Sequence, residues 1–150
     1  MWKKTFTLLS ILSLLLVVTA CKPNRPKGCP KLYRCAVRIL QEGEPLPGAL
    51  VSFIPEDDNL KKYTINALTD NEGLVTLKTQ MFFGAPLGKY KVTVAKSENL
   101  IGNVLIGEPP TTIPHVEPEL GDPETTTLSI EVIKKQKEPE VVEVGPDPSA

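Results

Sequence analysis

The chain has 150 residues, a formal net charge of −1 at pH 7 and a hydrophobic content of 41%. This length suits one small domain, and a charge so close to zero argues against a protein that binds nucleic acid. We therefore expect no nucleic acid among its partners.

The first part of the chain, residues 1–20, reads as a secretory signal peptide. Two lysines precede a mostly apolar run over residues 5–18. That run has the length of a signal's hydrophobic segment, whereas a membrane-spanning helix needs about twenty apolar residues. Small residues at the end of the run predict cleavage between Ala20 and Cys21. Two other readings stay open, namely an ordinary signal in which Cys21 is incidental and an uncleaved anchor.

The sequence Val18-Thr19-Ala20-Cys21 resembles the lipobox of bacterial lipoproteins. In that family the cysteine thiol receives a diacylglycerol, the chain is cut before the cysteine, and its new amino group often gains a further acyl chain such as palmitate. The resemblance implies lipidation of Cys21 and a membrane as partner through that lipid. Two or three acyl chains hold a protein firmly, whereas one holds it only marginally. Lys22 stands where some family members carry an inner-membrane retention Asp, which favours export to the outer membrane over the inner membrane.

Residues 21–32 are expected to form a lipidated tether. From Lys22 to Arg38 there are six Lys or Arg and no acid, so the segment either lies against anionic headgroups or is a solvated linker. Cys29 and Cys35 are a candidate disulfide, since an exported protein meets an oxidising compartment. In one continuous strand their Cα atoms would lie roughly 20 Å apart, so pairing requires an intervening turn. The alternative is one buried and one exposed thiol.

Short stretches of alternating apolar and polar residues predict β-strands through the rest of the chain. Turn residues separate them, most clearly in the Asp70–Gly73 segment. We expect a loop at 56–62 and a long irregular segment at 96–124, in which a few apolar residues could add a short strand at 101–106. The predicted strands are 33–39, 49–54, 63–69, 74–78, 89–95 and 126–133.

This pattern predicts an all-β sandwich over residues 33–133, because strands that bury one face need a second sheet to cover it. On the strand 89–95 we expect Tyr90, Val92 and Val94 to point inward and Thr93 outward. Residues 134–150 are charged and spaced by prolines, so we expect a disordered charged tail there rather than a further edge strand.

Three segments in order carry a second resemblance: Gly43–Phe53, Thr69–Val75 and Gly88–Val94. They resemble the carboxypeptidase regulatory-like domain, a seven-stranded transthyretin-like (prealbumin-like) β-sandwich. The later stretch Ile113–Val132 looks like the closing segment of small lipoproteins of this type from planctomycete bacteria. The resemblance implies a domain without catalysis.

The residue types argue against an enzyme, so we expect no catalytic residues, no cofactor and no metal. One histidine, His115, cannot supply the ligand or base sets of the enzymes that use related sandwiches, and no G-x-S-x-G motif is present. We expect His115 to be solvated or bonded to backbone. The acids of Glu56–Asp58 and Glu117–Glu124 leave calcium open but lack the EF-hand pattern, and a solvated loop is the alternative.

Taken together, the residues predict a non-catalytic, lipid-anchored cell-envelope module with a structural or protein-interaction role. The alternative is a module that binds a carbohydrate or another small ligand through aromatic residues such as Tyr63, Phe82 and Phe83. Of the last two, we expect one in the core and the other exposed. The partner, protein or glycan, is left undetermined by the sequence.

Overall fold

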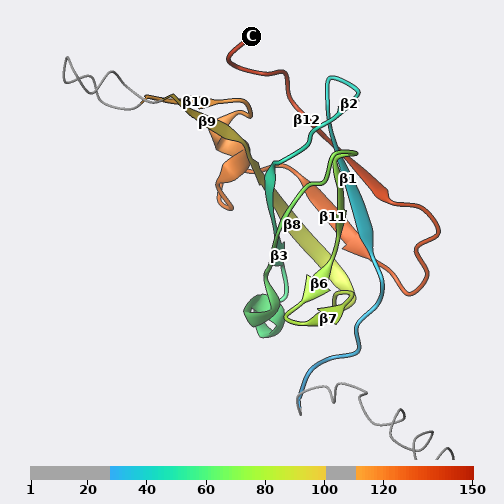
Figure 1. The fold of residues 1–150 in the computed structure, drawn as a ribbon. Helices are drawn as coiled ribbons and strands as arrows, with labels where there is room; N and C mark the ends of the chain where they lie inside the picture. Colours follow the sequence, from blue (N-terminus) through green and yellow to red (C-terminus); the bar gives the residue numbers. More distant parts are fainter. Residues whose placement is uncertain (1–27, 101–110) are drawn as a thin grey trace, which may run out of the picture.

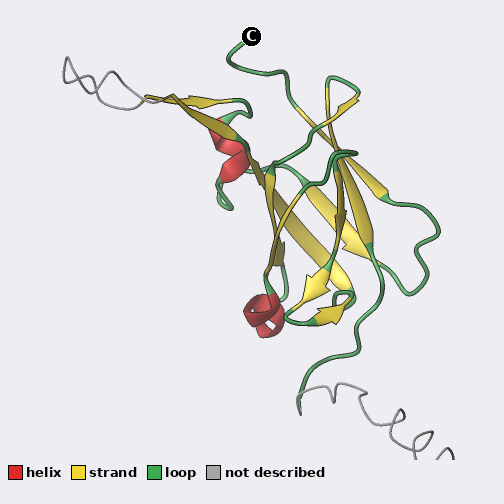
Figure 2. Cartoon of the chain, in the orientation of Figure 1, coloured by secondary structure: helices red, strands yellow, loops and turns green. Residues whose placement is uncertain are grey.

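The structure, a computed structural model, describes residues 28–100 and 111–150 (Figure 1). The prediction of an all-β sandwich is confirmed: two main sheets pack face to face, with only short 3-10 helices beside them (Figure 2). The signal peptide, Cys21 and the apolar residues at 101–106 lie outside the described residues.

One main sheet is antiparallel throughout, in the order β11-β8-β3-β4. Its registers place Val51 of β3 opposite Val94 of β8 on one side and opposite Ala67 of β4 on the other. The strands fall where the alternating pattern predicted them, within a few residues at each end. Their bounds are β3 Leu50–Pro55, β4 Ile65–Leu68, β8 Gly88–Ala95 and β11 Ser129–Val132.

The other main sheet is built around a central strand, β1, which covers Ala36–Gln41. On one side β1 pairs antiparallel with β2 (Glu44–Pro45) and with β5 (Leu74–Thr76). On its other side β1 pairs in parallel with β12 (Glu140–Val144). The sheet therefore joins residues that are about a hundred positions apart in the sequence.

Smaller elements lie at the ends of the sandwich. Two of them are short two-stranded ladders and two are 3-10 helices, in segments predicted as loops or irregular chain. They are β6 (Lys78–Thr79) with β7 (Phe82–Phe83), β9 (Ser97–Leu100) with β10 (Thr111–Pro114), η2 (Asp58–Tyr63) and η4 (Pro118–Gly121).

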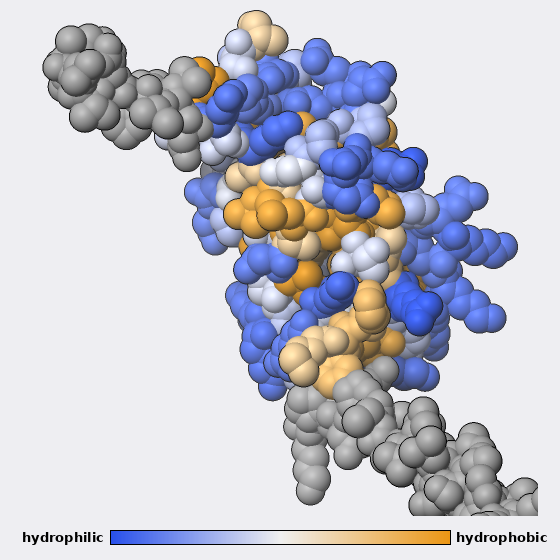
Figure 3. Space-filling view, in the orientation of Figure 1, coloured by the Kyte–Doolittle hydropathy of each residue, from blue (hydrophilic) through white to orange (hydrophobic). Residues whose placement is uncertain are grey.

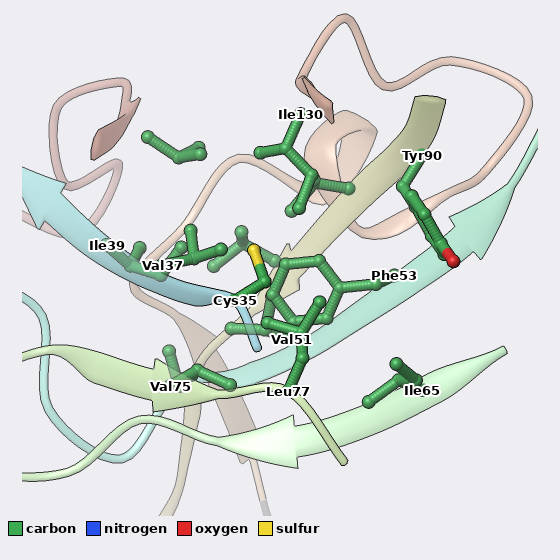
Figure 4. Close-up of a cluster of buried hydrophobic side chains, with 14 of the residues drawn as sticks. Cys35, Val37, Ile39, Val51, Phe53, Ile65, Val75, Leu77, Tyr90 and Ile130 are labelled. Carbon is green, nitrogen blue, oxygen red and sulfur yellow. The ribbon is translucent and has the colours of Figure 1, made fainter. Parts of the chain in front are cut away.

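The core lies between the sheets and consists of the inward side chains of each strand (Figure 4). Tyr90, Val92 and Val94 point inward as predicted and have no exposed surface. Thr93, predicted to point outward, alternates with these inward residues and yet is only 6% exposed, so this part of the outer face is covered. The helix η4, distant in the sequence, contacts β8, and the pattern within β8 does not reveal that contact.

The turn predicted at Asp70–Gly73 is confirmed, and its side-chain chemistry explains it. The Asp70 carboxylate accepts hydrogen bonds from the backbone N–H groups of Glu72 and Leu74, both at 2.9 Å. Gly73 has a φ of +67° and lies against the backbone carbonyl of Ile39, so a side chain there would be strained and would clash. This turn sets the register in which β5 returns along β1.

The prediction of a disordered tail over residues 134–150 is wrong for the segment that forms β12. Val142 and Val144 of this strand are buried against the core, and its backbone pairs with β1. Disorder was predicted because charged and proline residues surround the strand in the sequence. The further edge strand, the alternative to a disordered tail, is present instead, and the parallel pairing that orders it depends on β1, a partner distant in the sequence.

Alternate valines of β12 provide a matched test of this packing. Val142 is 5% exposed and its neighbour Val141 is 59% exposed. We expect Val142→Asp to lower the free energy of unfolding by about 3 kcal/mol, because it buries an unpaired carboxylate. Val141→Asp should change it by no more than about 0.5 kcal/mol. Denaturant unfolding of both variants would measure the difference, and equal effects would show that the tail is not packed.

Candidate functional site

The strands of the sandwich run between two ends, and each end carries a different set of loops and turns. We call the end where the described chain begins, at Gly28, the tether end; it carries η2, the β6–β7 hairpin and the 133–139 loop (Figure 1). We call the opposite end the far end; it carries the β1–β2 turn, the Asp70–Gly73 turn, the β9–β10 hairpin and the C-terminus. A chain anchored through its N-terminal segment would be held by the tether end.

The two cysteines of the candidate disulfide are not bonded to each other in the structure. Cys35 points into the core cluster, whereas Cys29 is half-buried ahead of the first strand (Figure 4). Burial is the main cause that raises the pKa of the Cys35 thiol to about 11, with the negative charge of Glu140 adding to it. The arrangement is that of one buried and one more accessible thiol.

A groove of about 430 Å³ opens at the tether end, beside the start of β1. Its lining includes Arg34, Cys35, Phe83, Gln136 and Glu138. The Gln136 side chain forms one wall by pairing with β1 as a neighbouring strand would. Its Oε1 accepts from the Ala36 N–H at 2.7 Å and its Nε2 donates to the Ala36 carbonyl at 3.0 Å. An aromatic ring beside charged groups in a groove of this size suits a small ligand.

The aromatic residues singled out in the sequence do not share one surface. Phe83 is 58% exposed, as expected for one of the two rings, but Phe82 is only half-buried and lies outside the core cluster, so the expected core ring is not found. The Lys78 ammonium lies 4.7 Å from the centroid of the Phe83 ring. Tyr63 is buried and donates a hydrogen bond of 3.1 Å to the Gly28 carbonyl, so it holds the start of the described chain instead of offering a binding face.

At the far end, His115 meets side chains from two distant segments. Its Nδ1 lies 2.9 Å from Oδ2 of Asp147 and 3.1 Å from Oγ of Ser149, and its Nε2 lies 3.7 Å from Oε2 of Glu98. Its backbone N–H donates to the Lys96 carbonyl at 2.8 Å. The expectation of a solvated or backbone-bonded histidine is wrong for the imidazole, which is half-buried and bonded to side chains. Sequence reasoning missed this cluster because the C-terminal residues were expected to be disordered.

A serine, a histidine and an aspartate therefore come together, but not as a nucleophilic triad. A triad needs the serine on one ring nitrogen and the acid on the other, whereas Asp147 and Ser149 both contact Nδ1 of His115. The Ser149 hydroxyl also donates to Asp147 at 2.6 Å. This geometry fastens the C-terminal segment to the sandwich and does not activate the serine.

The acidic segments considered for calcium are engaged within the protein. Asp57 accepts from the Asn59 N–H at the start of η2, and Asp58 pairs with Lys61 at 2.6 Å. Asp122 accepts from the Glu124 N–H at 2.8 Å. Over residues 28–100 and 111–150, no group of three or more His, Cys, Asp or Glu is placed to hold a metal ion.

Comparisons with protein families, with curated proteins and with solved structures found no match to this chain. Within the described part of the chain, no helix is both long and apolar enough to span a bilayer. The function must therefore be inferred from the residues and their arrangement.

The accessibility of the two thiols can be tested by alkylation of the purified protein at mildly alkaline pH. We expect Cys29 to react in the native protein and Cys35 to react only after denaturation, because burial keeps Cys35 protonated and covered. Peptide mass spectrometry would locate the label, and Cys29→Ser should remove the native signal. Protection of both thiols until a reductant is added would instead reveal a disulfide.

The far-end cluster makes a prediction for the Asp147 carboxyl. Hydrogen bonds from Ser149, and then from His115, lower its pKa to about 2 from an ordinary 3.8. These contacts therefore stabilise the fold above pH 3.8 and lose their effect as the pH falls through 2. An NMR titration should show the pKa of Asp147 rising toward 3.8, more in Ser149→Ala than in His115→Ala. The Asp58 carboxyl, whose pKa is lowered by Lys61, should titrate unchanged in both variants.

Proposed function

We propose that this chain is an exported lipoprotein whose sandwich acts as a non-catalytic cell-envelope module with a structural or protein-interaction role. In this proposal Cys21 becomes the first residue of the mature chain and carries the lipid. The domain is of the carboxypeptidase regulatory-like, transthyretin-like type, and the outer membrane is favoured because Lys22 follows the cysteine. An all-β sandwich is compatible with that assignment.

The observation that carries the proposal is where the described chain begins. Gly28 lies at the tether end, and Tyr63 holds it there through the hydrogen bond to its carbonyl. Only residues 22–27 separate Gly28 from Cys21, and a chain of that length spans at most about 25 Å. A lipid on Cys21 would therefore keep the tether end close to the bilayer and turn the far end away from it.

The far end then becomes the surface that a partner meets. Acidic residues at this end include Glu42, Glu72, Glu119 and Glu143, all exposed. A partner with a basic surface would be complementary to it, and charge complementarity raises association rates. The His115 cluster gives these loops a defined shape by tying the C-terminal segment to the β9–β10 region.

A second candidate function is the binding of a carbohydrate or another small ligand. The groove beside Phe83 favours it, because an exposed ring next to Arg34 and Glu138 combines stacking with hydrogen-bonding groups. A saccharide bound with a micromolar Kd on a glycan array, and lost in Phe83→Ala, would favour this alternative over the interaction module.

The lipid attachment is directly testable with a matched pair of cysteine variants. Cys21→Ser should abolish incorporation of a labelled fatty acid and release the protein from the membrane fraction or leave it as precursor, because no thiol remains to accept the diacylglycerol. Cys29→Ser should keep both properties. Intact-mass analysis of the wild-type protein should find a mature chain that begins at Cys21 with its lipid. Unchanged labelling of Cys21→Ser would refute the proposal.

A further inference from the structure

The tip of the β6–β7 hairpin exposes two large apolar side chains at the tether end. Met81 is 85% exposed and Phe83 is 58% exposed. Figure 3 shows an apolar area at this end of the molecule, beside the point where the described chain begins. Water-exposed methionine and phenylalanine side chains at adjoining positions make a small surface that gains free energy when it is covered.

The hairpin holds these side chains outward by a rigid backbone. Thr79 is buried, and its hydroxyl donates to the Gly84 carbonyl at 2.8 Å. The N–H of Gly84 donates to the Leu77 carbonyl at 2.8 Å, and the neighbouring Ala85 pairs with Tyr33. The exposure of Met81 is therefore a property of the fold and does not come from a loosely attached loop.

The tether end that carries this apolar tip is rich in basic residues. The Lys78 ammonium lies over the Phe83 ring, and further basic residues of the tether end are Lys31, Lys62, Lys89, Lys134 and Lys135. Acids also share this end, namely Glu56, Asp57, Asp58, Glu131, Glu138 and Glu140, and further basic residues there are Arg34, Lys61 and Lys137. Asp58 is paired with Lys61, and Asp57 is hydrogen-bonded within η2.

The far end has the opposite charge. Its acidic residues include Glu42, Glu44, Glu72, Glu98, Glu119 and Glu143, whereas the basic residue that the described chain places among them is Lys96. The nearly neutral net charge thus conceals a molecule that is basic where the tether leaves it and acidic at the other end. An anionic surface would attract the tether end and repel the far end.

We propose that the β6–β7 hairpin is a second membrane contact, with Met81 and Phe83 inserted among the headgroups of an anionic phospholipid bilayer and the surrounding lysines on its phosphates. This inference rests on the proposed lipid anchor, which confines the tether end to the bilayer surface. Lysines can keep their ammonium groups at the phosphates while their stems lie along apolar side chains. The Lys78 ammonium, 4.7 Å from the centroid of the Phe83 ring, is placed beside the side chain that would insert. The two contacts together would fix the orientation of the domain, which a lipid on Cys21 alone would not.

The test uses a fluorescent reporter in the full-length protein. The only tryptophan of the sequence, Trp2, belongs to the proposed signal peptide, so Phe83→Trp creates a single reporter in the mature chain. The matched control is Leu68→Trp, since Leu68 is 66% exposed and ends β4 toward the far end. Both variants are reconstituted into vesicles of phosphatidylcholine and phosphatidylglycerol with brominated acyl chains.

We expect emission of the Phe83→Trp variant to shift to shorter wavelength and to lose roughly half its intensity to the bromines, as insertion to the acyl boundary requires. The Leu68→Trp variant should show neither change. Replacing phosphatidylglycerol by phosphatidylcholine, or adding salt, should weaken the effect because both reduce the attraction of the lysines.

The outcomes separate this inference from the proposed anchor, because intact mass and vesicle flotation are measured on the same samples. Lipidated protein that floats while the two reporters behave alike would overturn the hairpin contact and keep the anchor. Quenching of Phe83→Trp by added anionic vesicles in a product without lipid would keep the contact and refute the anchor. Emission that responds to a protein or a saccharide but not to vesicles would overturn the contact in favour of a docking role for the hairpin.

Discussion

Exclusion of water between the two sheets is the constraint on which the rest of this structure depends. Val37 and Ile39 of β1 close over Phe53 and Tyr90 of the opposite sheet, and none of the four retains exposed surface. Burial is also the main cause that raises the pKa of the Tyr90 phenol to about 12, while its hydroxyl donates to the Pro86 carbonyl at 2.9 Å. A core this dry holds the strands in one register, and the register decides which loops meet at each end.

The parallel strand β12 links the core to the far end. Val142 and Val144 bury themselves against the core and thereby carry the C-terminus along β1. Because of this course, Asp147 and Ser149 arrive beside His115, more than thirty positions away in the sequence. The same packing that stabilises the sheet thus builds the one imidazole cluster found within the described residues.

The separation of acidic and basic residues between the two ends also follows from the course of the strands. Antiparallel neighbours return the chain to alternate ends, and turns rich in Glu fall at one end while lysines gather at the other. A protein that floated freely would gain little from such a separation. In a protein attached by its first residues to an anionic surface, this charge separation would orient the domain. The electrostatic attraction and the attachment would then act on the same end.

Much of the fold could be read from local pattern, because period-two alternation and turn chemistry act over a few residues. The sequence alone determined the all-β class, the inward face of β8 and the Asp70–Gly73 turn. The lipidation of Cys21 also rests on local sequence and stays a prediction. Only the tertiary structure decided that residues 140–144 form a strand, that η4 contacts β8 and that His115 meets Asp147. Each of these depends on a partner distant in sequence, and the free energy of such contacts is gained only once the sheets have packed.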